Sequence, residues 1–251
     1  CRTGRYNICP GVDFMATQPN YKGALTQYMT HPEEWTYHIP EGMTTMEGAL
    51  VEPAAVGMHA AVLGGAQPGK SIVILGGGTI GLMVLQACIS LGATDITVVD
   101  VIEKRLELAK KLGAARVING KEEDTVAVLR SEEMYGDHGV DLVFEAAGAV
   151  FTAQQAVQIV SRGGKIMMVG TQSKPVPIDF LKINREVTIQ TSFRYCNNFP
   201  QTIEAISSGR FNVKDMVTNI YDYEDVQKAF EEAIDPVKKT EMVKGVIKVA
   251  E

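Results

Sequence analysis

Six short apolar runs recur through the middle of the chain, and each is a predicted β-strand. They are rich in Val, Ile, Leu and Thr, and few polar residues interrupt them. A strand that is apolar throughout is buried on both faces, which is typical of a parallel sheet covered by helices on both sides. The six predicted strands are residues 71–75, 95–99, 116–118, 140–144, 165–169 and 187–192.

Segments with helical periodicity lie between these strands. Residues 103–112 show it most clearly, since Leu106, Leu108 and Leu112 stand among charged residues and Gly113 follows as a stop signal. Strands that alternate with crossover helices predict a doubly wound α/β domain of the dinucleotide-binding (Rossmann) type. The other predicted helices are residues 79–91, 122–133 and 152–160.

The two flanks of this region have weaker patterns. Residues 1–50 are rich in turn signals, with one strand predicted within 21–31, and the helix predicted over 45–63 contains Pro53, which should kink or break it. Neither flank resembles a complete domain, so we expect two pieces of one domain into which the sheet domain is inserted. The C-terminal flank is predicted to form helices at 199–207 and 223–234 and a closing strand at 243–249.

Composition excludes several classes of protein. The 251 residues include 24 Lys and Arg against 30 Asp and Glu, and the net charge of −6 argues against a nucleic-acid or anionic membrane partner. Hydrophobic residues make up 45% and charged residues 22%, so the chain can bury a core and is not a disordered segment. Four Cys are too few for a disulfide scaffold.

Two features bear on location. No charge occurs between Lys70 and Asp95, a stretch long enough to span a bilayer, but Gly76-Gly77-Gly78 would break a lipid-facing helix. We interpret the stretch as a strand, a turn and a helix of a soluble domain, and expect a cytoplasmic protein. The chain begins with Cys1 rather than Met and no secretion leader follows, so we expect a fragment of a longer protein.

A glycine-rich turn follows the first predicted strand. Residues 76–81 read Gly-Gly-Gly-Thr-Ile-Gly and fit the pattern G-x-G-x-x-G at the start of a predicted helix. In this pattern Gly76 permits the tight turn, Gly78 lets a pyrophosphate approach the backbone, and Gly81 lets the helix pack on the strand. The free N–H groups at the helix N-terminus then favour a phosphate.

Asp100 ends the second strand, nineteen positions after Gly81. A carboxylate there accepts hydrogen bonds from both hydroxyls of an adenosine ribose and repels a 2′-phosphate, so the spacing favours NAD over NADP. The simpler alternative to a cofactor site is a glycine-rich turn of an α/β domain beside a solvated Asp. A methyltransferase also pairs a glycine loop with an acid, but it usually has an acidic residue at the end of the first strand, where this chain has Leu75.

With these features, the chain resembles the zinc-dependent medium-chain dehydrogenases, and within them the sorbitol/iditol/xylitol (polyol) dehydrogenase branch. The resemblance implies a six-stranded Rossmann domain inserted in a GroES-like β-rich catalytic domain whose N-terminal part is absent here. It predicts a truncated first segment of the catalytic domain at residues 1–53, the dinucleotide-binding domain at 54–196 and the second segment of the catalytic domain at 197–251. Its further landmarks are residues 1–10 (CRTGRYNICP), 48–60 (GALVEPAAVGMHA), Gly163-Gly164 before Val169-Gly170, and 193–197 (FRYCN).

The resemblance also implies zinc. The family binds a structural zinc through four Cys, and Cys1 and Cys9 resemble the third and fourth of them; two ordinary thiols in a loop are the alternative. Glu52 resembles the carboxylate that completes or closely approaches the catalytic zinc site, and burying it on an apolar helix would otherwise be costly. A capping or salt-bridge carboxylate is the alternative there. The remaining catalytic ligands belong to the absent N-terminal part.

The implied activity is NAD-dependent oxidation of a secondary hydroxyl of a polyol to a ketose by zinc-assisted hydride transfer. Arg194 and Tyr195 follow the last predicted strand, and the resemblance implies that they contact the polyol while Phe14 lines the pocket; ordinary surface residues are the alternative. The implied cofactor contacts are Gly76, Gly78, Ile80, Gly81, Asp100, Arg105, Val169, Gly170, Thr171, Ser192 and Phe193.

Other functions remain open. We expect the isolated fragment to be inactive, and it can instead be a module that binds NAD and catalyses nothing. A threonine- or butanediol-type dehydrogenase is another alternative, against which Arg194 and Tyr195 argue. A zinc-free quinone reductase would leave Cys1, Cys9 and Glu52 unexplained.

Three smaller expectations complete the interpretation. The resemblance implies a homo-oligomer, a dimer or a tetramer, and the strand at 187–192 is the candidate for pairing across its interface. His59 has no second ligand at a metal-type spacing, so we expect a packed residue rather than a metal ligand. Cys88 and Cys196 are expected to be buried, inert thiols.

Overall fold

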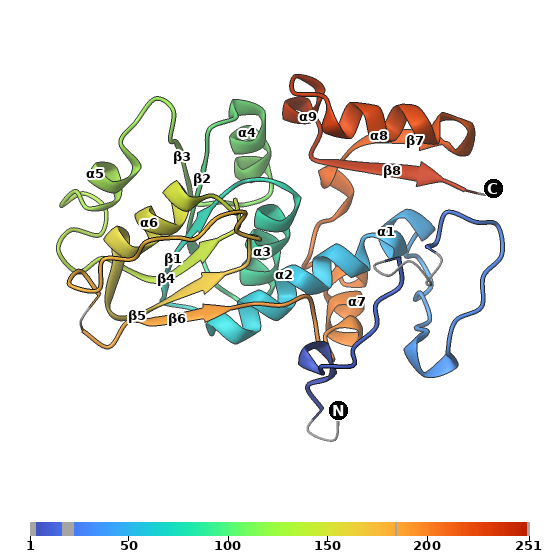
Figure 1. Ribbon diagram of the computed structural model, residues 1–251, viewed down its shortest axis with the longest axis horizontal. Helices are drawn as coiled ribbons and strands as arrows, with labels where there is room; N and C mark the ends of the chain where they lie inside the picture. Colours follow the sequence, from blue (N-terminus) through green and yellow to red (C-terminus); the bar gives the residue numbers. More distant parts are fainter. Residues whose placement is uncertain (1–3, 17–22, 184, 250–251) are drawn as a thin grey trace.

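Six parallel strands form the central sheet of the computed structural model, which describes residues 4–16, 23–183 and 185–249 (Figure 1). The strand order is β3-β2-β1-β4-β5-β6, and every neighbouring pair is parallel. The predicted six-stranded Rossmann-type sheet is therefore confirmed. The strands are β1 (Ser71–Leu75), β2 (Asp95–Asp100), β3 (Arg116–Asn119), β4 (Val140–Glu145), β5 (Val160–Met168) and β6 (Thr188–Thr191).

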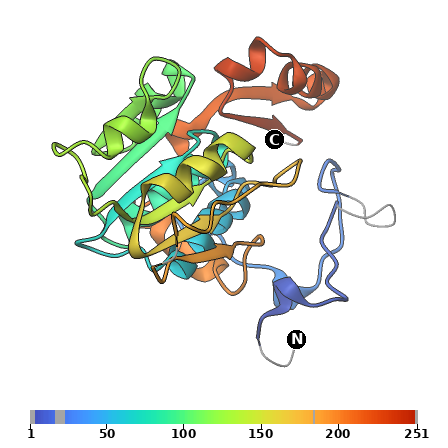
Figure 2. The ribbon, with the colours of Figure 1, turned by 60° about the vertical axis from the view of Figure 1, so that its left-hand side comes forward.

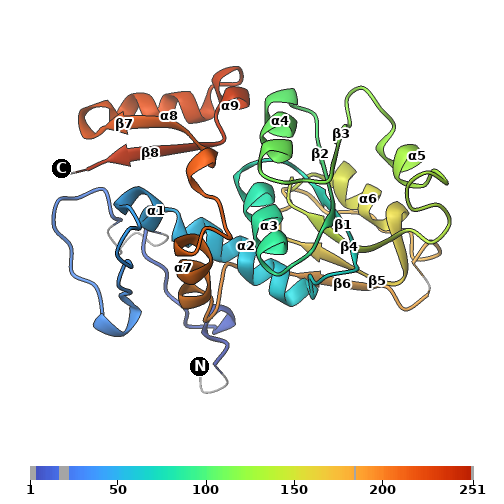
Figure 3. The ribbon, with the colours of Figure 1, turned by 180° about the vertical axis from the view of Figure 1, so that it is seen from behind.

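Each face of the sheet carries its own apolar core, because successive side chains of a strand point to opposite sides. Ile72 and Ile74 pack on the face covered by α2 (Val51–Gly64), α3 (Thr79–Ser90) and α4 (Glu103–Lys111) (Figure 3). Val73 and Leu75 pack on the opposite face, against α5 (Thr125–Leu129) and α6 (Val150–Ile159). Burial on both faces is the reason that these strands are apolar throughout.

The helix that precedes the sheet differs from its prediction. The predicted kink at Pro53 is wrong: the chain breaks at Leu50, between α1 (Thr45–Ala49) and α2. Pro53 lies in the first turn of α2, where a backbone N–H has no helical acceptor, so proline costs nothing there. Further along α2, a Cβ at Gly57 would lie 2.5 Å from the carbonyl carbon of Met83, so the backbones of α2 and α3 touch.

The N-terminal flank is mostly irregular. Its only regular elements in the described part before α1 are two short 3-10 turns, η1 (Tyr6–Ile8) and η2 (Glu33–Trp35), and the segment extends beside the sheet domain (Figure 2). The strand predicted within 21–31 is wrong over the described residues 23–31. Residues 24–31 are exposed, so no neighbouring strand supplies the hydrogen bonds that a strand requires.

The C-terminal flank forms a second, two-stranded parallel sheet. After α7 (Phe199–Ser207), which has its predicted bounds, comes the turn η3 (Lys214–Met216) and then β7 (Val217–Asp222), a strand that the sequence interpretation missed. The turn η4 (Tyr223–Asp225), α8 (Val226–Ile234) and α9 (Lys238–Glu241) lead to β8 (Lys244–Lys248), which pairs with β7 (Figure 1, red).

None of the described helices is long and apolar enough to cross a membrane. The uncharged stretch between Lys70 and Asp95 forms β1, a glycine turn and α3, as predicted.

Candidate functional site

The carboxyl ends of β1 and β4 meet in the middle of the sheet. From β1 the chain continues to one side of the sheet, through β2 and β3, whereas from β4 it continues to the other side, through β5 and β6. Open α/β sheets bind ligands at such a switch point. The predicted glycine turn lies at this point, directly after β1.

The glycines of this turn are required by close approaches of the backbone. Gly76 has φ +110°, and a Cβ there would lie 2.8 Å from the backbone nitrogen of Ala147. A Cβ at Gly81 would lie 1.8 Å from the carbonyl oxygen of Gly76. Gly78 is the N-cap of α3 and supplies no side-chain cap, so the first-turn N–H groups of the helix are available to an anion.

The carboxylate of Asp100 lies beside the glycine turn. Its Oδ2 accepts a hydrogen bond of 2.7 Å from the Gly77 N–H, and its Oδ1 accepts bonds of 2.8 and 2.9 Å from the N–H groups of Val101 and Ile102. The guanidinium of Arg105 lies 3.7 Å from Oδ2. Since the residue is only 8% exposed, the carboxylate is fixed in one orientation at the end of β2.

The C-terminal segment borders this end of the site. Arg105 donates a hydrogen bond of 3.3 Å to the carbonyl of Lys239, and the hydroxyl of Thr79 donates to the carbonyl of Val243. An ion pair of 2.8 Å joins Lys104 to Glu241. Residues 239–243 therefore lie against the start of both α3 and α4.

The other end of the site is built by the segments that follow β5 and β6. The N–H of Ser192 donates to the carbonyl of Met168, which joins the ends of the two strands. The hydroxyl of Ser192 and the side-chain carbonyl of Gln172 are buried without a hydrogen-bond partner among the described residues, as is Nε of Arg105. Unpartnered buried polar atoms along a glycine-lined switch point fit a bound dinucleotide, which would supply partners to them.

Glu145 is a candidate functional residue that the sequence interpretation missed. It ends β4, it is 0% exposed, and its side chain accepts hydrogen bonds from both neighbouring loops. A signal was present in the sequence, because an ionisable residue directly follows the apolar run 140–144. The groups that bind Glu145 come from segments up to 27 positions away, so a local sequence pattern does not predict these contacts.

The four residues predicted for catalysis or the substrate pocket, Phe14, Glu52, Arg194 and Tyr195, are brought together beyond β6 with the predicted cofactor contact Phe193. The guanidinium of Arg194 lies 4.1 Å from the ring centre of Phe14, which also has edge contacts with Phe193 at 5.9 Å and Tyr195 at 6.5 Å. Arg194 has φ +51°, a strained backbone that is typical of functional sites for a residue other than glycine.

Glu52 completes this cluster through Tyr195. Burial is the main cause that raises the pKa of Tyr195, the charge and hydrogen bonding of Glu52 add to it, and together they bring the pKa to about 12. Tyr195 therefore stays protonated at neutral pH. The expectation that Glu52 is buried on an apolar helix is wrong, because this residue is exposed in the first turn of α2.

The described residues do not form a zinc site. No group of three or more His, Cys, Asp or Glu among them is close enough to hold a metal ion. Cys9 is partly buried, and the predicted ligand Cys1 lies outside the described residues. The donors present therefore do not match the four ligands of a structural zinc or the three of a catalytic zinc.

The remaining candidates have structural contacts. Nδ1 of His59 donates a hydrogen bond of 2.9 Å to Oδ1 of Asn198; burial lowers the His59 pKa, this bond raises it, and the charge of Arg5 lowers it, leaving the pKa below its ordinary value. Cys88 is buried as predicted, and burial raises the pKa of its thiol. Cys196 is only partly buried, contrary to the prediction, and its thiol donates to the carbonyl of Gly4.

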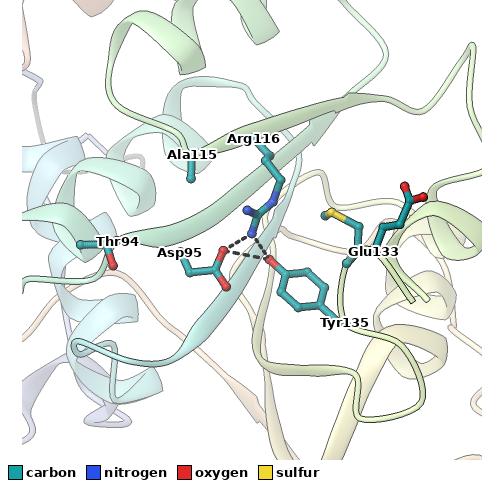
Figure 4. A pocket seen from close by; sticks show the side chains of 7 residues that line it. Thr94, Asp95, Ala115, Arg116, Glu133 and Tyr135 are labelled. Atoms are coloured by element: carbon teal, nitrogen blue, oxygen red, sulfur yellow. Dashed lines mark hydrogen bonds and ion pairs between the residues drawn. The ribbon is translucent and has the colours of Figure 1, made fainter. Parts of the chain in front are cut away.

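A hollow of about 410 Å³ lies away from this site, at the amino ends of β2 and β3 (Figure 4). Arg116 forms an ion pair with Asp95 there and donates a hydrogen bond of 2.9 Å to the Tyr135 hydroxyl. The Tyr135 hydroxyl is in turn 3.3 Å from Asp95. The charges of Asp95 and Arg116 therefore neutralise each other. None of the predicted site residues lines the hollow.

Comparison with known proteins agrees with this architecture. Residues 79–208 match the family described as zinc-binding dehydrogenase. The chain is 64% identical to the uncharacterized zinc-type alcohol dehydrogenase-like protein YdjJ of Escherichia coli (strain K12), over all of this chain and 71% of that protein. It is 40% identical to the sorbitol dehydrogenase of Bacillus subtilis (strain 168), over 93% of this chain and 66% of that protein.

A solved structure extends the likeness to three dimensions. The zinc-binding dehydrogenase of Sinorhizobium meliloti 1021, bound to NADP, has a TM-score of 0.91 at 25% identity, over 99% of this chain and 72% of that chain. The fold and the glycine turn define a nucleotide-binding α/β protein. The chain belongs to the zinc-binding dehydrogenase family, and its predicted likeness to the polyol dehydrogenases is confirmed.

Proposed function

We propose that the chain is the cofactor-binding part, and one wall of the substrate site, of an NAD-dependent polyol dehydrogenase. Oxidation of a secondary carbinol to a ketose requires a hydride acceptor, which bound NAD would supply, and the hydroxyl proton would be released to water. The chain's own residues would bind and orient the two reactants. The relatives that act on sorbitol support the substrate class, and the chain spans 66% of the length of one of them.

The fixed carboxylate of Asp100 is the observation that carries the choice of NAD. Three backbone N–H groups orient the oxygens of this carboxylate. It is therefore suited to accept hydrogen bonds from the hydroxyls of an adenosine ribose, and it would repel a 2′-phosphate. Arg105, the cation that could instead bind a 2′-phosphate, is paired with Asp100. The Sinorhizobium meliloti relative binds NADP, so the family alone does not decide between the two cofactors.

The remaining cofactor contacts are proposed by position. The pyrophosphate would lie at the N-terminus of α3, where Gly76, Gly78 and Gly81 leave the backbone accessible. Ile80 would cover it, and Arg105 would lie over the adenosine. The nicotinamide half would lie on the backbone of Val169, Gly170, Thr171, Ser192 and Phe193.

The polyol would lie beside Arg194 and Tyr195. The aromatic ring of Phe14 holds the Arg194 guanidinium by its face, which leaves the N–H edge free to donate to substrate hydroxyls. The neutral Tyr195 hydroxyl can donate or accept at the same place.

No step of this proposal runs through zinc, because the described residues do not supply a donor set. Roles of Cys1, Cys9 and Glu52 as zinc ligands would require further donors. We therefore expect the isolated chain to bind NAD without oxidising a polyol. The domain division at residues 53 and 196 and a homo-oligomer that pairs through β6 are further parts of the proposal.

Titration of the chain with NADH and NADPH, followed by nucleotide fluorescence, tests the cofactor. We expect NADH to bind at least about tenfold more tightly, which corresponds to 1.4 kcal/mol. Tighter binding of NADPH would overturn the choice of NAD, and no binding of either nucleotide would overturn the proposed function. Incubation with NAD and sorbitol, xylitol, iditol, threonine or butanediol should give no NADH, and turnover would contradict the expected inactivity.

A further inference from the structure

Glu145 is a buried carboxylate that no cation neutralises among the described residues. It ends β4 between β1 and β5, it is 0% exposed, and no salt bridge involves it in the described part of the chain. Burying a charge is costly unless hydrogen bonds compensate it, so an apolar residue would fill the same space at lower cost. A carboxylate at this position is therefore explained by its ability to accept hydrogen bonds from particular neighbouring groups.

Neutral donors from two loops provide the compensation. Oε1 of Glu145 accepts hydrogen bonds from the N–H groups of Ala147 (3.0 Å) and Gly148 (2.8 Å) and from the Thr152 hydroxyl (2.7 Å). Oε2 accepts one of 2.8 Å from the side-chain amide of Gln172. One side chain thus joins the loop after β4 to the loop after β5.

The backbone of the same residue strengthens this junction. The carbonyl of Glu145 accepts hydrogen bonds from the N–H groups of Val169 (2.8 Å) and Gly170 (2.9 Å). The two loops touch directly, since a Cβ at Gly170 would lie 2.3 Å from the nitrogen of Gly148, and a Cβ at Gly148 would lie 2.7 Å from the carbonyl oxygen of Thr171. The positions of residues 169–171 therefore depend on Glu145.

We propose that Glu145 is a positioning residue whose carboxylate fixes the loop 169–172 where the nicotinamide half of the cofactor binds. The inference rests on the proposed function, which assigns the nicotinamide half to Val169, Gly170 and Thr171. The adenosine half would lie on Asp100 and Arg105, which belong to β2 and α4. Among the described residues, no hydrogen bond or ion pair joins either of them to Glu145. Loss of the carboxylate should therefore affect the two halves of the cofactor unequally.

Binding of NADH and of AMP to the same variants separates these halves. In Glu145→Ala, four donors lose their acceptor: two N–H groups of the β4–α6 loop, the Thr152 hydroxyl in α6 and the Gln172 amide. We expect NADH to bind at least about tenfold more weakly while AMP binding changes by less than about twofold. Glu145→Gln should restore NADH binding to within about threefold of the original chain. The amide oxygen still accepts the three donors, and the unpartnered carbonyl of Gln172 can turn to accept from the new amide group.

Asp141→Ala is the matched control, because Asp141 lies at the amino end of the same strand and its side chain binds Ser71. It should lower the melting temperature and leave both affinities unchanged. If Glu145→Ala weakens NADH and AMP equally, or neither of them, the positioning role is overturned. Failure of the original chain to bind NADH would instead overturn the proposed function, and the inference with it.

If Glu145→Ala does not fold, Thr152→Val takes its place. It removes a single donor to Oε1, and we expect about threefold weaker NADH binding with unchanged AMP binding. Equal NADH affinity in the folded variant would overturn the proposal.

Discussion

At the amino ends of the strands, partly exposed polar groups bind one another, whereas at the carboxyl ends several buried polar atoms have no partner among the described residues. Asp95, Arg116 and Tyr135 form a closed network below β2 and β3, and Asp141 is joined to Ser71 by three hydrogen bonds of 2.9 to 3.0 Å. At this edge of the sheet the polar groups therefore supply most of one another's hydrogen bonds, and Arg116 Nε is the exception.

The carboxyl ends of the strands form the opposite edge of the sheet, and polar atoms there remain available to a ligand. Five buried side-chain polar atoms of the described residues have no partner, and four of them lie at or beyond the carboxyl ends of the strands. A buried polar atom without a partner costs roughly 1–3 kcal/mol, and a bound ligand can remove this cost. Under the proposed function, the difference between the edges separates stability from binding within one sheet. The four atoms are Arg105 Nε, Thr125 Oγ1, Gln172 Oε1 and Ser192 Oγ, and the fifth is Arg116 Nε.

The largest effect on this comparison is expected from Gly81→Ala at the carboxyl edge. The new Cβ would lie 1.8 Å from the Gly76 carbonyl oxygen, so the start of α3 must move away from β1. We expect the free energy of unfolding to fall by about 3 kcal/mol and NADH binding to be lost. Urea unfolding and NADH titration measure both. Gly11→Ala is the control, since open space surrounds Gly11 and both quantities should stay unchanged.

The second-largest effect is expected from Asp100→Ser, which should change the preference between NADH and NADPH. The variant loses the ribose acceptor and frees Arg105 from its ion pair, so a 2′-phosphate meets a cation instead of a carboxylate. We expect NADH to bind about tenfold more weakly and NADPH more tightly than in the original chain. If both nucleotides weaken alike in fluorescence titrations, Asp100 supports the loop and does not select the cofactor.

A smaller effect should be confined to the amino edge. Tyr135→Phe removes the hydroxyl that binds Asp95 and Arg116, and Thr97 loses a 3.2 Å neighbour as well. We expect the free energy of unfolding to fall by about 1 kcal/mol with no change in NADH affinity. A change in affinity without a change in stability would contradict the separation of the two edges.

The sequence predicted the sheet well because burial on both faces leaves a strong local signal. The run 71–75 coincides with β1, and each other run overlaps its strand. β7 was missed because its sequence, VTNIYD, is neither apolar throughout nor strictly alternating, and only Tyr221 of the strand is buried. The helix predicted over 122–133 is only Thr125–Leu129, since Asp124 caps its start and a turn follows Arg130.

The candidate site was predictable where one segment builds it. The glycine turn and Asp100 follow a local spacing, so their positions could be inferred from the sequence alone. Glu145 could not, because its role arises where the loops after β4 and β5 meet, and its partner Gln172 is 27 positions away. The exposure of Glu52 was also hidden, since it depends on what packs against the start of α2.

The smallest expected effect concerns the pH dependence of the amino edge. Burial raises the pKa of Asp141, but hydrogen bonds from the Ser71 N–H and hydroxyl, together with His138, outweigh burial and hold the pKa below its ordinary value of 3.8. A carboxyl group whose pKa is lowered by folding stabilises the fold above its ordinary pKa, and this contribution is lost as the pH falls through the lowered value.

Asp141→Asn should therefore lower the free energy of unfolding by about 0.5 kcal/mol at pH 7, a small amount because the carboxylate is partly exposed. The difference between the two chains should hold down to about pH 4 and shrink below it, as both then carry a neutral side chain. Urea unfolding in steps from pH 7 to pH 3 measures it. A difference that stays constant over the whole range would mean that the Ser71 contact depends on shape alone and not on the charge of Asp141.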